Sequence, residues 1–173
     1  MTQKIKSLHT IYISVGSNIQ REQHVRAGLH AMYHAFGELR LSSVYESEAV
    51  GFSGTHFYNL VVQAHTTDTV QQVCVRLKKI EEENQRIRGD KKFAPRTLDL
   101  DLLLYDDIVD DELVELPRAE ILFNAFVLQP LAEIAATEMH PLVGRTYQSL
   151  WNDYDKSKQK LWPIEFIWKA DPQ

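Results

Sequence analysis

The hydrophobic and polar positions of this chain switch between the period of a strand and the period of a helix. Residues 11–15 alternate aliphatic side chains with Tyr12 and Ser14, which predicts a strand that the G-S-N sequence at 16–18 ends. Apolar residues then recur at helical spacing, and Gly37 is placed to end that helix. The apolar stripe of this helix consists of Val25, Leu29, Met32 and Phe36.

Two more strands and a second helix are predicted next. Residues 39–46 and 57–64 have the composition of strands, and a loop separates them. Asp68 is the expected N-cap of the second helix, which a charged stretch containing Gly89 ends and Pro95 stops. The apolar stripe of this helix consists of Val70, Val73, Leu77 and Ile80.

The second half of the chain begins with a strand of leucines and aspartates from residue 98. The E-L-V-E-L-P sequence at 112–117 is expected to pair with this strand across an acidic turn. A third helix is predicted over about 126–136, with Pro130 near its first turn or at a kink. The tail has no clear period. About four strands with interspersed helices predict an α+β or α/β sandwich, and the sheet order does not follow from the pattern.

Composition narrows the class of protein. The chain has 173 residues, and this length favours a single domain that spans residues 1–173. Its 44% hydrophobic and 25% charged residues are ordinary for a globular protein. The formal net charge of -5 argues against a nucleic-acid partner. Cys74 is the only cysteine, which excludes an intramolecular disulfide and a cysteine-based zinc site. Without an apolar run for a membrane span or a signal peptide, we expect a cytoplasmic protein. A monomer is expected as well.

The most informative segment is the strand in which two acids alternate with leucines. A strand places alternate side chains on opposite faces, so Asp99 and Asp101 are expected to point the same way. Neighbouring like charges repel each other and are costly to bury. This face is therefore either the solvated side of an edge strand or the partner of a positive charge. The opposite face is apolar and consists of Leu98, Leu100 and Leu102.

Cations are dense beside these acids. Arg96 lies three residues before Asp99, and further basic residues precede it at Arg86, Arg88, Lys91 and Lys92. Paired carboxylates with cations are what a site for Mg²⁺ and a polyphosphate needs, and alternate strand positions, about 6.6 Å apart, suit two metal ions. A solvated charged connector is the alternative for the basic segment. No P-loop or Rossmann motif is present, and the seven histidines show no H-E-x-x-H pattern, so each is assigned to the surface or to a structural role.

The segment A-P-R-T-L-D-L-D-L-L-L-Y-D-D at 94–107 resembles the P-R-x-x-D-[LIV]-D signature of the 6-hydroxymethyl-7,8-dihydropterin pyrophosphokinases of folate biosynthesis. The resemblance covers roughly residues 10–151 in the same order. Other segments that carry it are I-Y-I-S-V-G-S-N-I, F-Y-N-L-V-V-Q-A, R-I-R-G, F-V-L-Q-P-L-A-E-I-A and H-P-L-V-G-R-T.

This resemblance implies a fold, a reaction and its cofactors. The fold is α+β, a ferredoxin-like α/β sandwich in which helices flank an antiparallel-containing central sheet. The reaction transfers the β,γ-pyrophosphoryl group of ATP to the hydroxymethyl oxygen of the pterin and releases AMP. ATP is the co-substrate, and two Mg²⁺ ions are expected at Asp99 and Asp101.

The resemblance also implies the residues on the nucleotide side. Arg86 and Arg88 match basic positions of a mobile catalytic loop, and Arg96 matches the arginine of the signature. Lys92 and Phe93 stand where the family commonly has arginine and tryptophan. The residues implied in catalysis are Arg86, Arg88, Arg96, Asp99 and Asp101. Those implied in ATP binding are Glu81, Lys92, Phe93, Arg96 and Arg118.

For the pterin, the family uses an asparagine on a strand and two aromatic rings that sandwich the flat substrate. Asn59 matches the asparagine, Phe57 stands where tyrosine is usual, and Phe126 matches the second ring. Core packing is the alternative for both phenylalanines, and a helix cap is the alternative for the G-S-N turn. Other implied contacts of the same pocket are Gly16, Ser47 and Val50.

Three further positions depart from the family pattern on the nucleotide side. The usual Pro-His-Pro is replaced by Pro117, Arg118 and Ala119, and Asn124 replaces an arginine. These departures leave three hypotheses: an active pyrophosphokinase, a divergent homologue that binds pterin or nucleotide with little transfer, and another Mg²⁺-dependent phosphotransferase or nucleotidyltransferase. The retained acids and Asn59 favour the first hypothesis.

Overall fold

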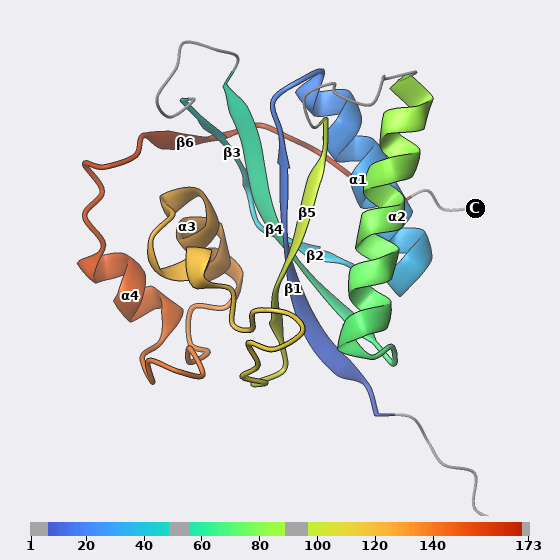
Figure 1. Cartoon of the computed structure of the whole chain (residues 1–173). Helices are drawn as coiled ribbons and strands as arrows, with labels where there is room; N and C mark the ends of the chain where they lie inside the picture. The colour runs from blue at the N-terminus through green and yellow to red at the C-terminus, as the bar shows by residue number, and fades with distance from the viewer. Residues whose placement is uncertain (1–6, 49–55, 89–96, 171–173) are drawn as a thin grey trace, which may run out of the picture.

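The computed structural model describes residues 7–48, 56–88 and 97–170 and contains one antiparallel sheet between two layers of helices (Figure 1). The strands are β1 (His9–Ser17), β2 (Arg40–Leu41), β3 (Val44–Ser47), β4 (Phe57–Thr66), β5 (Asp99–Tyr105) and β6 (Leu161–Ile164). The helices are α1 (Arg21–Phe36), α2 (Val70–Arg88), α3 (Ala125–Ile134) and α4 (Tyr147–Asp153), with a 3₁₀ turn η1 (Ala119–Leu122).

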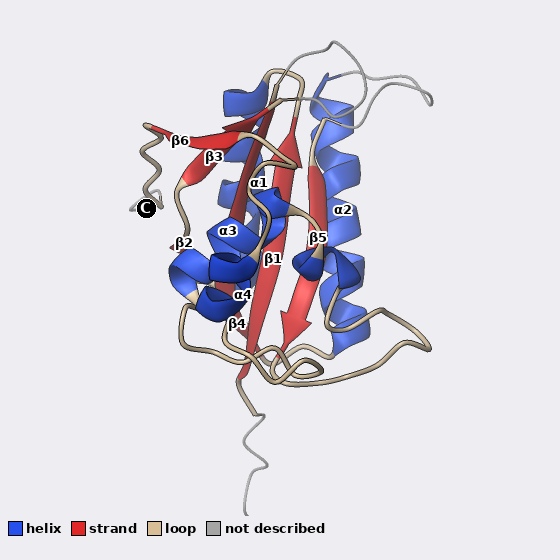
Figure 2. Ribbon diagram, turned by 90° about the vertical axis from the view of Figure 1, so that its left-hand side faces the viewer, coloured by secondary structure: helices blue, strands red, loops and turns tan. Residues whose placement is uncertain are grey.

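The strands are ordered β5-β1-β4-β3-β6, and β2 pairs with a second segment of β4. All the pairings between these strands are antiparallel. Helices α1 and α2 cover one face of the sheet, and α3 and α4 cover the other (Figures 1 and 2). The predicted α+β fold, with an antiparallel sheet flanked by helices, is therefore confirmed.

Each face of the sheet has its own hydrophobic core. One core joins the sheet to α1 and α2, and the other joins it to α3 and α4. In β5, Leu100 and Leu102 belong to the first core. Asp99 and Asp101, which alternate with them, therefore face the side of α3. The prediction that both aspartates share one face of a strand backed by leucines is confirmed.

Both predicted apolar stripes are confirmed, and Gly37 ends α1 with a φ of 84°. The start of α2 differs from the prediction. Thr69 is the residue before the helix, and it forms a capping box in which the Gln72 backbone N–H donates to Thr69 Oγ1 (3.2 Å) and the Thr69 N–H donates to Gln72 Oε1 (2.8 Å). The predicted cap, Asp68, instead accepts a hydrogen bond from Arg76 Nε (2.6 Å).

Three strand predictions were wrong in detail. Strand β1 continues through Gly16 and Ser17, because these residues still pair with β4. The single strand predicted at 39–46 is broken between β2 and β3, where the Ser42 hydroxyl accepts the Val61 N–H (2.9 Å) and replaces a ladder bond. The 112–117 segment forms no strand with β5, and its pairing is one bridge between Asp110 and Leu116.

The third helix begins one residue before and ends two residues before its predicted bounds, and it includes Pro130. The tail contains two elements without a sequence prediction, α4 and β6. Strand β6 extends the sheet beside β3, and Trp168 after it packs against the core under α1. No helix in the described ranges is long and apolar enough to cross a membrane.

Candidate active site

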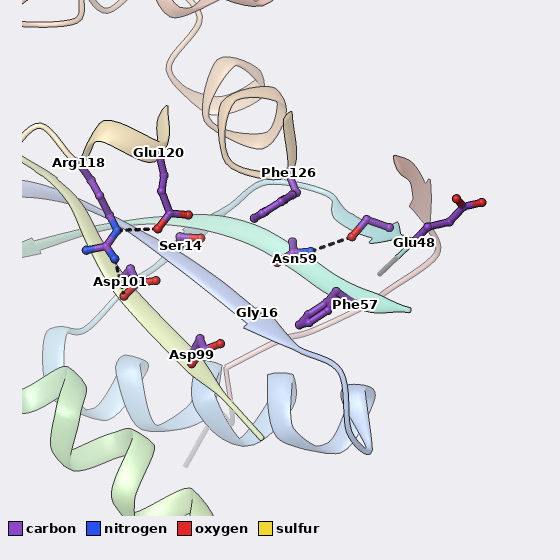
Figure 3. A pocket seen from close by; sticks show the side chains of 11 residues that line it. Ser14, Gly16, Glu48, Phe57, Asn59, Asp99, Asp101, Arg118, Glu120 and Phe126 are labelled. Atoms are coloured by element: carbon purple, nitrogen blue, oxygen red, sulfur yellow. Dashed lines mark hydrogen bonds and ion pairs between the residues drawn. The ribbon is translucent and has the colours of Figure 1, made fainter. Parts of the chain in front are cut away.

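A cavity of about 440 Å³ lies on the α3 side of the sheet, where β1 ends and where β4 and β5 begin (Figure 3). It is lined by Ser14, Gly16, Ser47, Glu48, Phe57, Asn59, Asp99, Asp101, Arg118, Glu120 and Phe126. Eight of the residues predicted for the site are on this wall, from segments up to about a hundred positions apart in the sequence.

One row across three strands organises the cavity floor. Gly16 of β1 lies opposite Asp99 of β5 on one side and opposite Asn59 of β4 on the other. Directly opposed residues of an antiparallel pair point to the same face of the sheet, so the carboxylate and the amide flank a position without a side chain. The next row pairs Ser14 with Asp101. The predicted pterin and metal residues therefore meet at Gly16.

Asn59 is held in a buried position. Its side chain is 6% exposed, and its Nδ2 donates a hydrogen bond to Ser47 Oγ (3.2 Å). Beyond it in the same row, Tyr45 donates to Glu133 Oε1 (2.6 Å), and burial together with this bond raises the pKa of Tyr45. Asn59 is thus a buried polar group, held by Ser47 at the end of the cavity that Phe57 and Phe126 also line.

Two aromatic rings frame this polar group. Phe57 comes from the start of β4 and Phe126 from the first turn of α3, and Asn59 lies between the two rings in the view of Figure 3. Both rings line the cavity and are partly exposed. They are therefore available to a ligand, which core packing alone would not require.

The strand that carries the acids is fixed by polar contacts around its first residues. Ser17 Oγ donates to the Thr97 carbonyl (2.5 Å), and Asn84 Nδ2 donates to Thr97 Oγ1 (3.0 Å). The carboxylate of Glu81 accepts the Leu100 backbone N–H (2.9 Å). Because β5 is an edge of the sheet, Glu81 satisfies a donor that no neighbouring strand reaches. Glu81 itself is not part of the cavity lining.

A second charged group enters the cavity from the segment between β5 and α3. The Arg118 guanidinium approaches Asp101, with 3.5 Å between Nη2 and Oδ1, and its Nε donates to Glu120 Oε1 (3.2 Å). The three side chains are each about one third exposed. Arg118 is therefore a positive partner of Asp101, one of the two alternatives that the double-aspartate strand left open.

Similar known proteins identify the family of this chain. A sequence model of the 7,8-dihydro-6-hydroxymethylpterin-pyrophosphokinase family matches residues 12–136. The chain belongs to this family. The pyrophosphokinase of Aquifex aeolicus is 32% identical over 136 residues, which are 77% of this chain and 84% of the relative. That of Haemophilus influenzae is 34% identical over 142 residues, 76% of this chain and 85% of the relative.

Solved structures agree in fold. The wild-type HPPK-DHPS protein of Plasmodium falciparum superposes with a TM-score of 0.67 at 14% identity, over 88% of this chain and 46% of that one. This chain therefore spans less than half of that longer protein. At this identity the comparison bears on the fold alone.

Several predicted site residues fall outside what the structure describes. Val50, Lys92, Phe93 and Arg96 belong to ranges that it does not describe, and so do the side chains of Arg86 and Arg88 at the end of α2. Their implied roles stay predictions.

Asn124, which replaces a family arginine, has a structural role here. Its Nδ2 donates to Glu120 Oε2 (2.9 Å), and its Oδ1 accepts from Gln159 Nε2 (3.2 Å). Gln159 Oε1 in turn accepts the Ala125 N–H (2.6 Å) at the start of α3. The residue thus links the cavity wall to the C-terminal segment.

Three cavity residues were missed by the sequence analysis: Ser14, Glu48 and Glu120. Ser14 had a signal, because it lies two positions before Gly16 on the same face of a strand. Glu48 directly follows Ser47 at the end of β3. Glu120 had no signal, because its contact with Arg118 depends on the turn that η1 makes.

The donors in this cavity fit Mg²⁺. Asp99 and Asp101 present carboxylate oxygens, and Ser14 adds a hydroxyl opposite Asp101. Hard Mg²⁺ prefers oxygen ligands and usually combines one or two carboxylates with water and substrate phosphates. The residues present therefore suit this ion in the company of a polyphosphate.

Proposed function

We propose that this protein transfers the β,γ-pyrophosphoryl group of ATP to the hydroxymethyl oxygen of 6-hydroxymethyl-7,8-dihydropterin, with Mg²⁺, and releases AMP. The observation that carries the proposal is the row Asp99, Gly16, Asn59, which sets an acid for metal and phosphate beside an amide for a flat heterocycle. The two substrates would meet above Gly16, which has no side chain to separate the two groups.

The Asn59 end suits the pterin. Its amide offers a donor and an acceptor to the edge of the pyrimidine ring, while Ser47 holds the amide in place. Phe57 and Phe126 would cover the two faces of the flat ring. This arrangement would aim the hydroxymethyl group toward β5.

The β5 end suits the triphosphate. Asp99 and Asp101 would hold the metal, and the Arg118 guanidinium would neutralise phosphate oxygens. Mg²⁺ held by these acids would supply positive charge that stabilises the negative charge developing on the phosphates during transfer. The pterin hydroxyl oxygen would form a bond to the β-phosphorus, the bond from that phosphorus to the α,β-bridging oxygen would break, AMP would leave with that oxygen, and the hydroxyl proton would pass to solvent.

The substrates are ATP and the pterin, and a monomer that binds no nucleic acid is expected to be the working form. Two Mg²⁺ ions are proposed because each of the two acids lines the cavity separately.

Production of AMP tests this function. The full chain is incubated with ATP and Mg²⁺, with and without the pterin, and AMP and the pterin diphosphate are quantified. The expected result is AMP formed only with the pterin, in equal amount to the diphosphate, and lost in Asp101→Asn.

Two other outcomes would refute the proposal in different ways. AMP formed without pterin would indicate a phosphotransferase with another acceptor. Calorimetric binding of the pterin without any AMP would indicate a homologue that binds but does not transfer, with Asn124 in place of the family arginine as the first residue to restore.

A further inference from the structure

Arg118 is attached to the cavity wall at two levels. Its backbone N–H donates to the Leu103 carbonyl (3.0 Å), which fixes it beside β5, two residues beyond Asp101. Its Nε edge is bonded to Glu120 at 3.2 Å, while its Nη2 is 3.5 Å from Asp101 (Figure 3). The first side-chain contact has hydrogen-bond geometry, and the second is a longer ion pair.

Glu120 is itself restrained. Its second oxygen accepts from Asn124 (2.9 Å), and Asn124 is bonded to Gln159 of the C-terminal segment. One edge of the Arg118 guanidinium is therefore anchored to a connected set of bonds, and the edge that faces Asp101 is the one able to change partner.

We propose that Arg118 is a resident counter-ion, which pairs with Asp101 before the metal and nucleotide arrive and then turns its outer edge from Asp101 to a phosphate oxygen. The proposal rests on the proposed function and adds that Arg118 changes its partner when the metal and the nucleotide bind. Two same-face acids repel each other, and a nearby cation reduces that repulsion. A divalent cation at Asp101 would repel the guanidinium, and the incoming phosphates would attract it.

This arrangement makes two effects of Arg118 opposite in sign. The arginine competes with a divalent cation for Asp101, and it assists the nucleotide. Replacing Arg118 by glutamine should therefore strengthen binding of a divalent cation alone and weaken binding of ATP. Replacing a residue that only contacts the nucleotide would change the affinity for ATP and leave the affinity for the divalent cation alone unchanged.

Binding of Mn²⁺ to the nucleotide-free chain tests the proposal. Electron paramagnetic resonance measures unbound Mn²⁺ during titration of the wild type, Arg118→Gln and the control Arg76→Gln. The control changes the net charge equally, and Asp68, the partner of Arg76, is not part of the cavity lining. We expect Arg118→Gln to bind Mn²⁺ about fivefold more tightly, the scale of a partly exposed ion pair, and Arg76→Gln to bind like the wild type.

A second titration, with a non-hydrolysable ATP analogue in saturating Mg²⁺, should show weaker binding to Arg118→Gln. Unchanged or weaker Mn²⁺ binding by Arg118→Gln would overturn the counter-ion role, and so would an equal gain in Arg76→Gln. Because the Mn²⁺ experiment involves no pterin and no turnover, its result is separate from the result of the AMP assay.

A different observation points to a second metal site, on the opposite layer of the molecule. His30 and His34 lie one turn apart on the exposed side of α1, with 3.1 Å between their Nε2 atoms and ring centroids 4.5 Å apart. The sequence favoured a surface or structural role for each histidine, so this contact was not anticipated.

The spacing is that of two ligands of one ion. Nitrogens bound to a metal at about 2.0–2.1 Å, with angles between square and tetrahedral, lie about 2.8–3.4 Å apart. We infer that this pair chelates a divalent ion of the later transition series, such as Ni²⁺, Cu²⁺ or Zn²⁺, with water in the other positions. Imidazole favours these ions, whereas the carboxylates of the cavity favour Mg²⁺ and Mn²⁺.

Tyr33 lies between the histidines and a tryptophan, so metal binding can be followed by fluorescence. The centroid of its ring is 5.9 Å from that of His34 and 6.3 Å from that of Trp168. Ni²⁺ is titrated into the full chain in saturating Mg²⁺, which occupies the acids, and heat and tryptophan emission are recorded. We expect His34→Gln to bind at least about tenfold more weakly, and exposed His65→Gln to bind like the wild type. Equal Ni²⁺ affinity in the wild type and His34→Gln would overturn the site, as would an equal loss in His65→Gln.

Discussion

A Cβ atom at position 16 would lie 2.8 Å from Oδ1 of Asn59, closer than real Cβ contacts come. The amide of Asn59 therefore occupies the space that the glycine leaves open. Asn59 is 6% exposed and is held by Ser47 from its other side, so it has little room to withdraw. The glycine is needed for the position of a neighbouring side chain as well as for access to the cavity.

Gly16→Ala should thus impair the pterin end of the site. We expect pterin affinity, measured by calorimetry, to fall at least about tenfold, which corresponds to about 1.4 kcal/mol. Gly28→Ala is the matched control, because its Cβ would also be crowded, at 3.0 Å from Leu98 Cδ2, but in the core on the other face. That variant should lose stability and keep its pterin affinity. Equal pterin affinity in Gly16→Ala and the wild type would contradict this account.

The two acids of β5 should be essential for turnover and dispensable for folding. We expect Asp99→Asn and Asp101→Asn each to lower kcat at least about 100-fold, because a metal ligand is lost. Their melting temperatures should stay equal to the wild type or rise, since repulsion between same-face acids is relieved. Asp107→Asn, an exposed acid two residues beyond β5, is the control. Wild-type kcat in both variants would remove the metal assignment.

Glu81 should act on the strand rather than on a ligand. Its carboxylate accepts the Leu100 N–H on the outer edge of the sheet. Glu81→Leu leaves that donor without this acceptor and should lower the free energy of unfolding by about 1–3 kcal/mol, measured with urea. Glu81→Gln retains an acceptor oxygen and should lose less. If exposed Glu82→Leu destabilises the protein equally, the strand contact is not the cause.

His140 should make folding stability depend on pH. It is 1% exposed, and its Nδ1 accepts the backbone N–H groups of Leu142 (3.2 Å) and Val143 (3.1 Å). Burial lowers the pKa of His140 below its ordinary value of 6.5. An imidazolium offers no acceptor at Nδ1, so protonation would also break both bonds.

The sign follows from the lowered pKa. As the pH falls below about 6.5, the unfolded chain takes up a proton before the folded one does, so the free energy of unfolding decreases, by at most about 1.4 kcal/mol per pH unit. His140→Asn keeps an acceptor that does not titrate. In urea unfolding below pH 7, this variant should therefore lose the part of the pH dependence that comes from His140. Exposed His65→Asn should leave it in place. The same pH dependence in His140→Asn would assign the effect to other groups.

Local patterns predicted the elements whose periods are uninterrupted. The stripes of α1 and α2 followed from helical spacing, and the orientation of Asp99 and Asp101 followed from the alternation in β5. The helix cap was assigned to the wrong residue because two adjacent residues, Asp68 and Thr69, are both good caps, and only the bond with Gln72 separates them. Strand β6 is a four-residue edge strand, too short to show a period, and it is defined by its pairing with β3.

The sequence by itself determined which residues are candidates for the site: alternation singled out the two aspartates, and the family resemblance singled out Asn59 and the two phenylalanines. Only the tertiary structure decided how they meet. The order β5-β1-β4 places Asp99 and Asn59 on the two sides of Gly16, and strand order depends on contacts between distant segments that no local pattern records. The pairing of Arg118 with Asp101 and Glu120 is of the same kind, because a side chain finds its partner only after the backbone has folded around it.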